Sequence, residues 1–334
     1  MTQTSVVIGA TGQDGSYLIP KLLGLGHKVY GMKRRASSLN TQRLDDIYQD
    51  PHDNNQLELV YGDLSDYSSI ASLIGDTKPD LVFNLGCQSM VRVSYDIPEY
   101  TFDVGATGAL RVMEAIRKCS PKSRSLFAAS SEMFGSTAPP QNETTAFHPR
   151  SPYAISKVAG YWTTINYRES YGLHASNAIS FNHESKNRAE NFVTRKITRG
   201  AARIKMGLQN KLFLGNLSAK RDWSHASDMI DAMYLIITAD EPDDYVVASG
   251  QMHSVREFAE VVFSQLGMDY KEYVEFDKRY LRPAEVDALM GDATKIKNKL
   301  GWQPKYTFDM LVKEMIDYDM KLAKQELILK NNDD

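Results

Sequence analysis

Four polar residues in the middle of the chain have the types and spacing of a proton-transfer site: Ser130, Glu132, Tyr153 and Lys157. Tyr153 and Lys157 are four residues apart, and the preceding Ser151-Pro152 pair is a strong start signal for a helix. The two side chains would therefore lie on one face of its first turns. A tyrosine, with an ordinary pKa of ~10, needs nearby positive charge to act as a base at neutral pH. Lys157 and an oxidised nicotinamide would supply that charge, and Ser130 would hydrogen-bond the reacting hydroxyl.

Glu132 distinguishes this set from that of a simple dehydrogenase. It follows Ser130-Ser131 directly, where we expect the fifth strand to end. Once C4 of a hexose becomes a ketone, the proton on C5 is acidified and a carboxylate can remove it. Loss of the C6 hydroxyl as water then leaves an alkene that accepts hydride at C6. The order of these residues therefore predicts an enzyme that oxidises a sugar, dehydrates it and returns the same hydride.

A glycine-spaced turn near the N-terminus predicts a dinucleotide site. Gly9, Gly12 and Gly15 follow a strand-like segment and open a helical one. Glycines there allow a tight turn and close approach of the backbone to a pyrophosphate, which the helix N-terminus attracts. We expect the dinucleotide to contact Gly9, Thr11, Gly12, Gln13, Asp14 and Gly15.

The end of the second expected strand, Gly31-Met32-Lys33-Arg34-Arg35, indicates which dinucleotide binds. A carboxylate at this place would bond the ribose 2′-hydroxyl of NAD, whereas basic residues accept the 2′-phosphate of NADP. Three consecutive cations without an acid favour NADP. Asp63-Leu64, after the third strand, is placed to meet the adenine. Leu85–Ser89, after the fourth strand, would pass near the nicotinamide ribose.

Alternating short apolar runs and helix-length segments predict the framework that positions these residues. Such alternation is typical of βαβ units with a parallel sheet. Strands are expected at 5–8, 28–32, 57–61, 81–85, 125–129 and 174–179, and helices at 16–25, 67–75, 105–118 and 152–171. We predict an α/β fold: a Rossmann-type doubly wound parallel sheet with a smaller, discontinuous C-terminal substrate lobe.

The change of composition after Phe181 sets the expected domain borders. Residues 1–181 would form the NADP-binding domain, to which a helix at 228–239 and a strand at 245–248 return, within a segment of about 225–250. The polar, Arg- and Lys-rich residues 182–224, together with 251–330, would form a nucleotide-sugar-binding lobe over the carboxyl ends of the strands. The final residues, from Lys330, are expected to be a frayed polar tail.

The overall composition is that of an ordinary globular protein. The chain has 334 residues, of which 42% are apolar and 24% charged, with a formal net charge of −3. This balance gives no electrostatic reason to expect nucleic acid or an anionic membrane as a partner. Cys87 and Cys119 lack the neighbouring partners of a metal site and suit a reducing cytosol. With neither a signal-peptide pattern nor a long apolar run, a cytoplasmic location is expected.

Several longer stretches resemble the GDP-mannose 4,6-dehydratase family of extended short-chain dehydrogenases/reductases, over nearly the whole chain. The stretches similar to the family's cofactor and catalytic segments are Gly9–Tyr17, Arg34–Asn40 and Ser151–Tyr153. Those similar to its substrate segments are Phe181–Ser185, Asn191–Ile197, Gly215–Trp223 and Arg282–Asp287. Such agreement in order and spacing is far more specific than a glycine turn alone.

The resemblance implies the conversion of GDP-mannose to GDP-4-keto-6-deoxymannose, with NADP as an internal hydride store. The catalytic residues it implies are Ser130, Glu132, Tyr153 and Lys157. Those for the cofactor are Arg34, Arg35, Ser37, Asp63, Leu64, Leu85, Gly86, Gln88, Ser89, Tyr100, Lys157, His183 and Arg188. Those for the nucleotide-sugar are Ser89, Asn182, Lys196, Arg221, Arg282 and Glu285, with no metal. It also implies a homodimer or homotetramer built on the helix that carries Tyr153, with the Arg34–Arg43 loop reaching a neighbour's cofactor.

The chain departs from the family's pattern in ways that leave alternatives open. Ser130 replaces a threonine, Cys87 an alanine, Met90 a histidine, Glu190 a glycine, and Lys186-Asn187 a Pro-Arg-like pair. The substrate could therefore be another GDP-sugar, such as GDP-manno-heptose. A nucleotide-sugar epimerase or decarboxylase would share the glycine turn and the Tyr/Lys pair. A non-catalytic NADP-sensing or scaffold protein would keep the fold alone.

Overall fold

The centre of the molecule is a seven-stranded sheet in which all neighbouring strands are parallel. The computed structural model describes residues 2–38, 40–47 and 56–333. The strands of the sheet are β1 (Thr4–Ile8), β2 (Lys28–Lys33), β3 (Leu57–Tyr61), β4 (Leu81–Asn84), β5 (Arg124–Ser130), β6 (Ala175–Ser180) and β11 (Asp244–Val247). Their spatial order is β3-β2-β1-β4-β5-β6-β11, so the direction of winding reverses between β1 and β4. Ligands of doubly wound folds bind at that point, outside the carboxyl ends of the strands.

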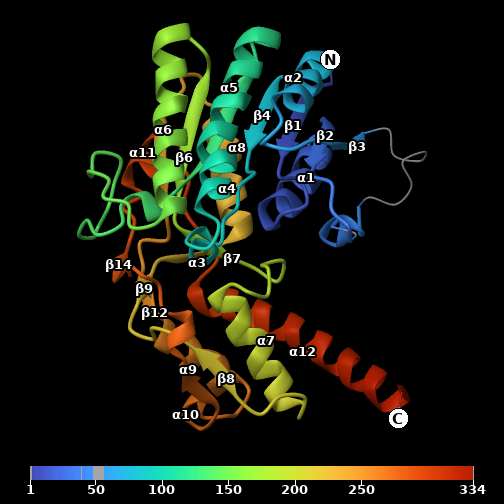
Figure 1. Ribbon diagram of the computed structural model, residues 1–334, viewed down its shortest axis with the longest axis vertical. Helices are drawn as coiled ribbons and strands as arrows, with labels where there is room; N and C mark the ends of the chain where they lie inside the picture. Colours follow the sequence, from blue (N-terminus) through green and yellow to red (C-terminus); the bar gives the residue numbers. More distant parts are fainter. Residues whose placement is uncertain (1, 39, 48–55, 334) are drawn as a thin grey trace.

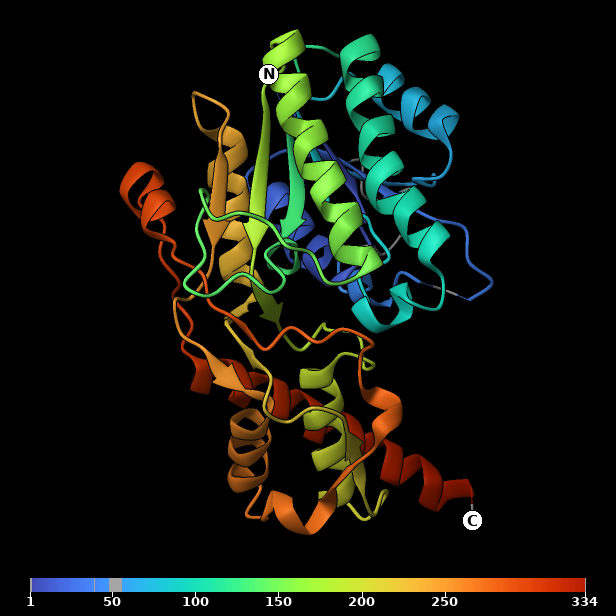
Figure 2. The same cartoon turned by 60° about the vertical axis from the view of Figure 1, so that its left-hand side comes forward.

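Helices cover both faces of this sheet (Figures 1 and 2). One face carries α2 (Tyr67–Thr77), α5 (Gly108–Cys119) and α6 (Pro152–Tyr171), which pack side by side in that order. The other carries α1 (Gln13–Gly24) and α8 (Ala226–Thr238), which contact each other. The predicted fold class is confirmed, and α8 and β11 are the helix and strand expected to return to the sheet.

A second hydrophobic core lies below the sheet in Figure 1. Helices α7 (Val193–Lys205), α9 (Val255–Gln265) and α12 (Phe308–Asp333) enclose Phe258, Phe263 and Met315. The short elements around them are β8 (Leu212–Leu214), β9 (Lys220–Arg221), β12 (His253–Ser254), α10 (Tyr270–Tyr273), β13 (Val274–Phe276), η4 (Lys278–Tyr280) and β14 (Ala288–Leu289). A parallel pair, β7 (Asn182–Glu184) and β10 (Trp223–His225), lies between this core and the sheet.

The remaining helical elements are short and lie close to the strand ends. They are η1 (Gln42–Leu44), α3 (Val91–Ser94), α4 (Pro98–Phe102), η2 (Asp103–Thr107) and η3 (Ser131–Met133), together with α11 (Thr294–Leu300), which packs on β11. The helix expected at 105–118 thus begins with the π-helical turn η2. There Gly105 lets the backbone approach α6, where a Cβ would lie 2.3 Å from Ser156 Oγ.

Two segments behave differently from the sequence-based expectation. Residues from Lys330 to Asp333 continue α12 instead of fraying, because the packed first half of the helix supplies the costly nucleus. Ile296 and Trp302 fall in the range assigned to the substrate lobe but pack into the core between the sheet, α1 and α8. Trp302 Nε1 donates a hydrogen bond to the Asp228 carbonyl at 3.0 Å, which holds this segment against α8. Leu39, in the Arg34–Asn40 stretch, lies outside the described residues. Among the described residues, no helix is long and apolar enough to cross a membrane.

Candidate active site

A cavity of about 680 Å³ opens at the carboxyl ends of the strands, between the sheet and the second core. Most residues predicted to form the site line it, although they come from both halves of the molecule. They are Gly9, Thr11, Gly12, Gln13, Asp14, Arg34, Asp63, Leu64, Leu85, Gly86, Gln88, Ser89, Tyr100, Ser130, Glu132, Tyr153, Lys157, Asn182, His183, Arg188, Lys196, Arg221, Arg282 and Glu285. Gly15, Arg35 and Ser37 do not line it.

The glycine turn has the shape that a pyrophosphate needs. Gly9 has a φ of +87°, and a Cβ there would lie 3.0 Å from the backbone nitrogen of Gly86 on the neighbouring strand end. A Cβ on Gly15 would lie 2.2 Å from the Ala10 carbonyl oxygen, so α1 can approach β1 only with glycine at this position. Gly12 is the N-cap of α1, and no side chain from the described residues caps that turn. The first amides of α1 therefore point into the cavity entrance, ready for an anion.

The basic stretch after β2 divides into two parts. Arg34 lines the cavity, and its Nη1 donates to the Tyr100 hydroxyl at 3.2 Å. Arg35 turns back and donates to the carbonyl of Ala36. Arg34 and Arg35 are both exposed, but of the two only Arg34 lines the cavity.

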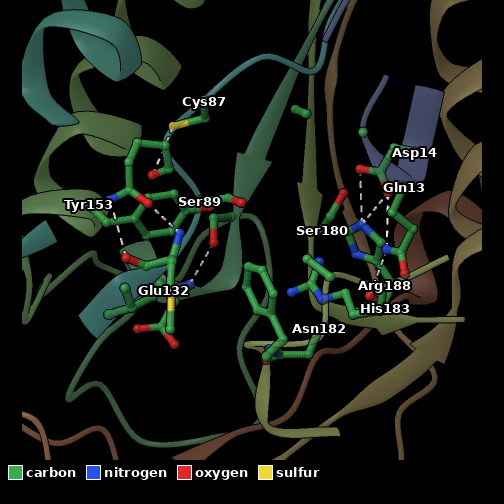
Figure 3. A pocket seen from close by; sticks show the side chains of 18 of the residues that line it. Gln13, Asp14, Cys87, Ser89, Glu132, Tyr153, Ser180, Asn182, His183 and Arg188 are labelled. Carbon is green, nitrogen blue, oxygen red and sulfur yellow. Dashed lines mark hydrogen bonds and ion pairs between the residues drawn. The ribbon is translucent and has the colours of Figure 1, made fainter. Parts of the chain in front are cut away.

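His183 and Asp14 form an ion pair between the glycine turn and β7. His183 Nε2 lies 3.1 Å from both carboxylate oxygens of Asp14, and its Nδ1 lies 2.8 Å from the Phe181 carbonyl oxygen. Burial alone would raise the pKa of Asp14, but the charge and hydrogen bond of His183 and the charge of Arg188 lower it to about 2. Burial lowers the pKa of His183, and the charge of Asp14 outweighs this and raises it above its ordinary value. Figure 3 shows this pair across the pocket from Tyr153.

The start of α6 places Tyr153 and Lys157 as the sequence predicts. Ser151 caps the helix, its Oγ accepting the Ala154 amide at 3.0 Å, and Pro152 is the first helical residue. Lys157 Nζ is buried and donates to the Ala128 carbonyl of β5 at 2.6 Å. It lies 5.8 Å from the centre of the Tyr153 ring, so both side chains share one face of the helix.

The protein's own groups do not activate the Tyr153 phenol. Burial raises the pKa of Tyr153, and the neighbouring Cys87 and Glu132 add to this increase. A hydrogen bond with Ser130 and the charge of Arg188 act in the opposite direction but do not cancel it. The sequence-based expectation named Lys157 together with an oxidised nicotinamide as the source of positive charge for Tyr153. Burial outweighs the protein's own charges, and the contribution of the nicotinamide stays a prediction.

Glu132 is held among cations from the second core. It is 6% exposed and lies in η3, the turn that follows β5. Its Oε1 lies 3.3 Å from Arg282 Nη1 and 3.9 Å from Arg221 Nη2. Arg282 is further fixed by its backbone amide, which donates to Glu285 Oε1 at 2.9 Å. A candidate base and two candidate anion ligands thus meet at one point of the cavity.

Sequence reasoning assigned neither of two residues to the site of this chain: it named Arg43 only in a loop that reaches a neighbour's cofactor, and it did not single out Tyr280. Arg43 bridges the glycine turn and the loop after β7, because its Nη1 donates to the Thr11 carbonyl at 3.3 Å and its Nε to the Asn187 carbonyl at 2.7 Å. Tyr280 lines the cavity, with Lys196 Nζ 3.2 Å from its ring centre. These contacts join segments far apart in the chain, so no local sequence pattern predicts them.

The ion pair of Asp14 and His183 predicts a pH-dependent stability. An acid with a lowered pKa stabilises the fold above its ordinary value of 3.8, and a histidine with a raised pKa does so below its ordinary value of 6.5. The contribution should be lost below pH ~2 and as the pH rises through the raised pKa of His183. Asp14→Asn should therefore lower the free energy of unfolding by about 1–2 kcal/mol near pH ~5.5 and by less near pH ~9, measured by urea denaturation.

The matched control for this measurement is Asp317→Asn, which removes an exposed partner of Lys313. It should change the free energy of unfolding by less than about 0.5 kcal/mol at either pH. An Asp14→Asn penalty that is equal at both pH values would contradict the ion pair.

Comparison with known proteins agrees with this geometry. The sequence model of the family described as GDP-mannose 4,6 dehydratase matches residues 6–315. GDP-mannose 4,6 dehydratase 1 of Arabidopsis thaliana is 57% identical over 331 residues, covering 97% of this chain and 92% of the plant protein. The dTDP-glucose 4,6-dehydratase of Bacillus anthracis, solved with NAD, is similar in fold (TM-score 0.84, 21% identity, 97% and 98% covered). RMD from Pseudomonas aeruginosa, solved with NADPH, has a TM-score of 0.78 at 24% identity, with 96% and 100% covered.

The two solved structures establish only the fold, because their identity is low. The family model and the plant relative cover nearly the whole chain, including both ends of the cavity. The resemblance seen in the sequence is thereby confirmed, and the chain belongs to the GDP-mannose 4,6-dehydratase family.

Proposed function

We propose that this protein converts GDP-mannose into GDP-4-keto-6-deoxymannose and water, without net oxidation. The observation that supports this most directly is that Tyr153 and Glu132 line one cavity together with Arg221 and Arg282. A dehydrogenase needs only one proton acceptor, such as Tyr153. The second base is needed when the oxidised sugar must also lose water.

A nicotinamide dinucleotide fits the sheet side of the cavity. The turn from Gly9 to Gly15 leaves room for a pyrophosphate against the first amides of α1. We propose NADP, because Arg34 lines the cavity after β2, where a 2′-phosphate is expected, and can pair with a phosphate. When bound, the nicotinamide would supply a hydride acceptor for C4 of the sugar and, once reduced, a hydride donor for C6. Its positive charge would also favour ionisation of Tyr153.

In this proposal Tyr153 removes the proton from the C4 hydroxyl. Ser130 hydrogen-bonds the same oxygen, since its hydroxyl lies near the phenol and lowers the pKa of Tyr153. Lys157 holds the strand end through the Ala128 carbonyl and keeps a positive charge below the phenol. Together these residues fix the direction from which the hydroxyl approaches.

Glu132 then carries the elimination. Its carboxylate takes the C5 proton, which the C4 ketone has acidified, and the acid so formed returns a proton to the departing C6 hydroxyl. One water leaves. When hydride returns to C6, C5 needs a proton, and the one that Tyr153 took from the C4 hydroxyl supplies it. The carbon skeleton thus gains and loses the same two electrons. Arg221, Arg282 and Lys196 hold the diphosphate, and Glu285 faces the donors of guanine.

The place where a different sugar would be recognised is Met90. It lines the cavity, and Asn191 Nδ2 lies 3.1 Å from its sulfur, whereas Lys186 and Asn187 are not among the lining residues. GDP-manno-heptose therefore stays the alternative substrate. Another departure, Cys87, is partly buried and lies near Tyr153, where it adds to the rise in the pKa of the phenol.

Self-association and a cytoplasmic location stay predictions. Ile155 and Trp162 project from α6 and are 48% and 56% exposed, which supports association through this helix.

Incubation with GDP-mannose should give a product lighter by one water, detected by mass spectrometry, without added NADPH. Glu132→Gln should lower this rate by about 10²–10⁴-fold, because the neutral amide cannot accept the C5 proton. Retained binding of GDP and NADP by the variant would show that its fold is intact. Absence of turnover with every GDP-hexose and GDP-heptose tested would contradict the proposal, and an unimpaired variant would remove Glu132 from its role.

Arg34→Gln should weaken NADP binding by roughly 10- to 100-fold while leaving NAD binding nearly unchanged, because only NADP offers a 2′-phosphate. Calorimetric titration of both dinucleotides measures this difference. Arg35→Gln is the matched control: it removes the same charge from a side chain outside the cavity and should have the smaller effect. Equal losses for NAD and NADP in Arg34→Gln would refute the preference.

A further inference from the structure

The two arginines beside Glu132 are oriented toward it by the surrounding backbone. Arg221 is 5% exposed, and its Nη1 donates to the carbonyls of Lys220 and Val286, both at 2.9 Å. This leaves Nη2 directed at Glu132 Oε1, 3.9 Å away, and Arg282 Nη1 reaches the same oxygen at 3.3 Å. The carboxylate of Glu132 therefore accepts a hydrogen bond from Arg282 and lies within ion-pair distance of Arg221.

Other carboxylates near the arginines do not occupy these donors. Glu285 accepts the backbone amide of Arg282 and leaves its guanidinium free. Asp287 is exposed, lies within electrostatic reach of Arg221, and is not among the residues that line the cavity. Within the described residues, Glu132 is the carboxylate whose ion pairs reach both guanidinium groups.

A diphosphate needs the same donors. Under the proposed function, on which this step rests, Arg221 and Arg282 bind the diphosphate of a GDP-sugar. Guanidinium groups pair with phosphate and with carboxylate through the same N–H donors, and a doubly charged diphosphate outcompetes a single carboxylate. The two anions therefore compete for one set of cations.

We propose that Glu132 is an internal counter-ion of the diphosphate site, which the substrate's diphosphate displaces. Without a nucleotide, the arginines neutralise the catalytic carboxylate. When the nucleotide binds, they turn to the phosphates, and the carboxylate is released toward the sugar. Binding energy from the nucleotide, a part of the substrate that does not react, thus prepares the base. A sugar lacking the diphosphate would meet a base that is still paired.

The test measures GDP affinity and does not require turnover. Calorimetric titration of GDP into the NADP-loaded full-length protein should show that Glu132→Gln binds GDP more tightly than wild type, by on the order of tenfold. Guanosine, which has no phosphate, should bind both proteins alike. Asp287→Asn, the matched control, removes a nearby exposed charge and should change GDP affinity by less than about twofold. Glu132→Ala, with unchanged NADP affinity as the check of folding, should show the same direction.

A double-variant cycle locates the competition at the arginine. Arg282→Gln should bind GDP more weakly than wild type, and in that background Glu132→Gln should gain less than about twofold. Equal GDP affinity of wild type and Glu132→Gln, or an equal gain with and without Arg282, would overturn the inference while leaving the proposed function standing. Failure of the wild-type protein to bind GDP would overturn the nucleotide site itself, and this inference with it.

Discussion

A carboxylate buried to 6% exposure needs opposite charge close by, because otherwise the loss of its hydration is not compensated. Glu132 has this charge from Arg221 and Arg282, which belong to the segments around the second core. Glu132 leaves the sheet at the end of β5, whereas its counter-ions come from β9 and from the loop before β14. The site is therefore complete only when the two halves of the molecule are docked, and the same contact places the proposed substrate between them.

The two ends of the cavity are built by different physical means. At the cofactor end the backbone forms the cavity wall, since Gly9 and Gly15 let strand ends and α1 approach more closely than any side chain allows. At the substrate end, charged side chains form the cavity wall, and hydrogen bonds to backbone groups and ion pairs with one another hold them in place. Tyr153 stands where these ends meet, on a helix whose start is capped by Ser151. A helix thus carries the proposed proton acceptor, and less regular segments carry the residues proposed to bind the substrate.

Local signals explain what could be predicted from the sequence. Three signals depend only on neighbouring residues: the glycine turn, the Ser-Pro helix start and the alternation of strands and helices. They were enough to predict the sheet and the placing of Tyr153 and Lys157 on one face of a helix. The contact between Glu132 and Arg282 spans 150 residues, and that of Arg43 with Asn187 spans 144, so nothing nearby announces either. The raised pKa of Tyr153 depends on burial, which a sequence does not display. For the same reason the packing of Trp302 beneath the sheet could not be foreseen.

In the proposed reaction, one hydride leaves C4 of the sugar and returns to C6 of the same molecule. The most direct measurement uses GDP-mannose carrying deuterium at C4 and locates the label in the product by mass spectrometry and NMR. Transfer of the deuterium to C6, undiluted by unlabelled substrate turned over in the same mixture, is the predicted result. Deuterium found in solvent or in free reduced coenzyme, with none at C6, would contradict the account.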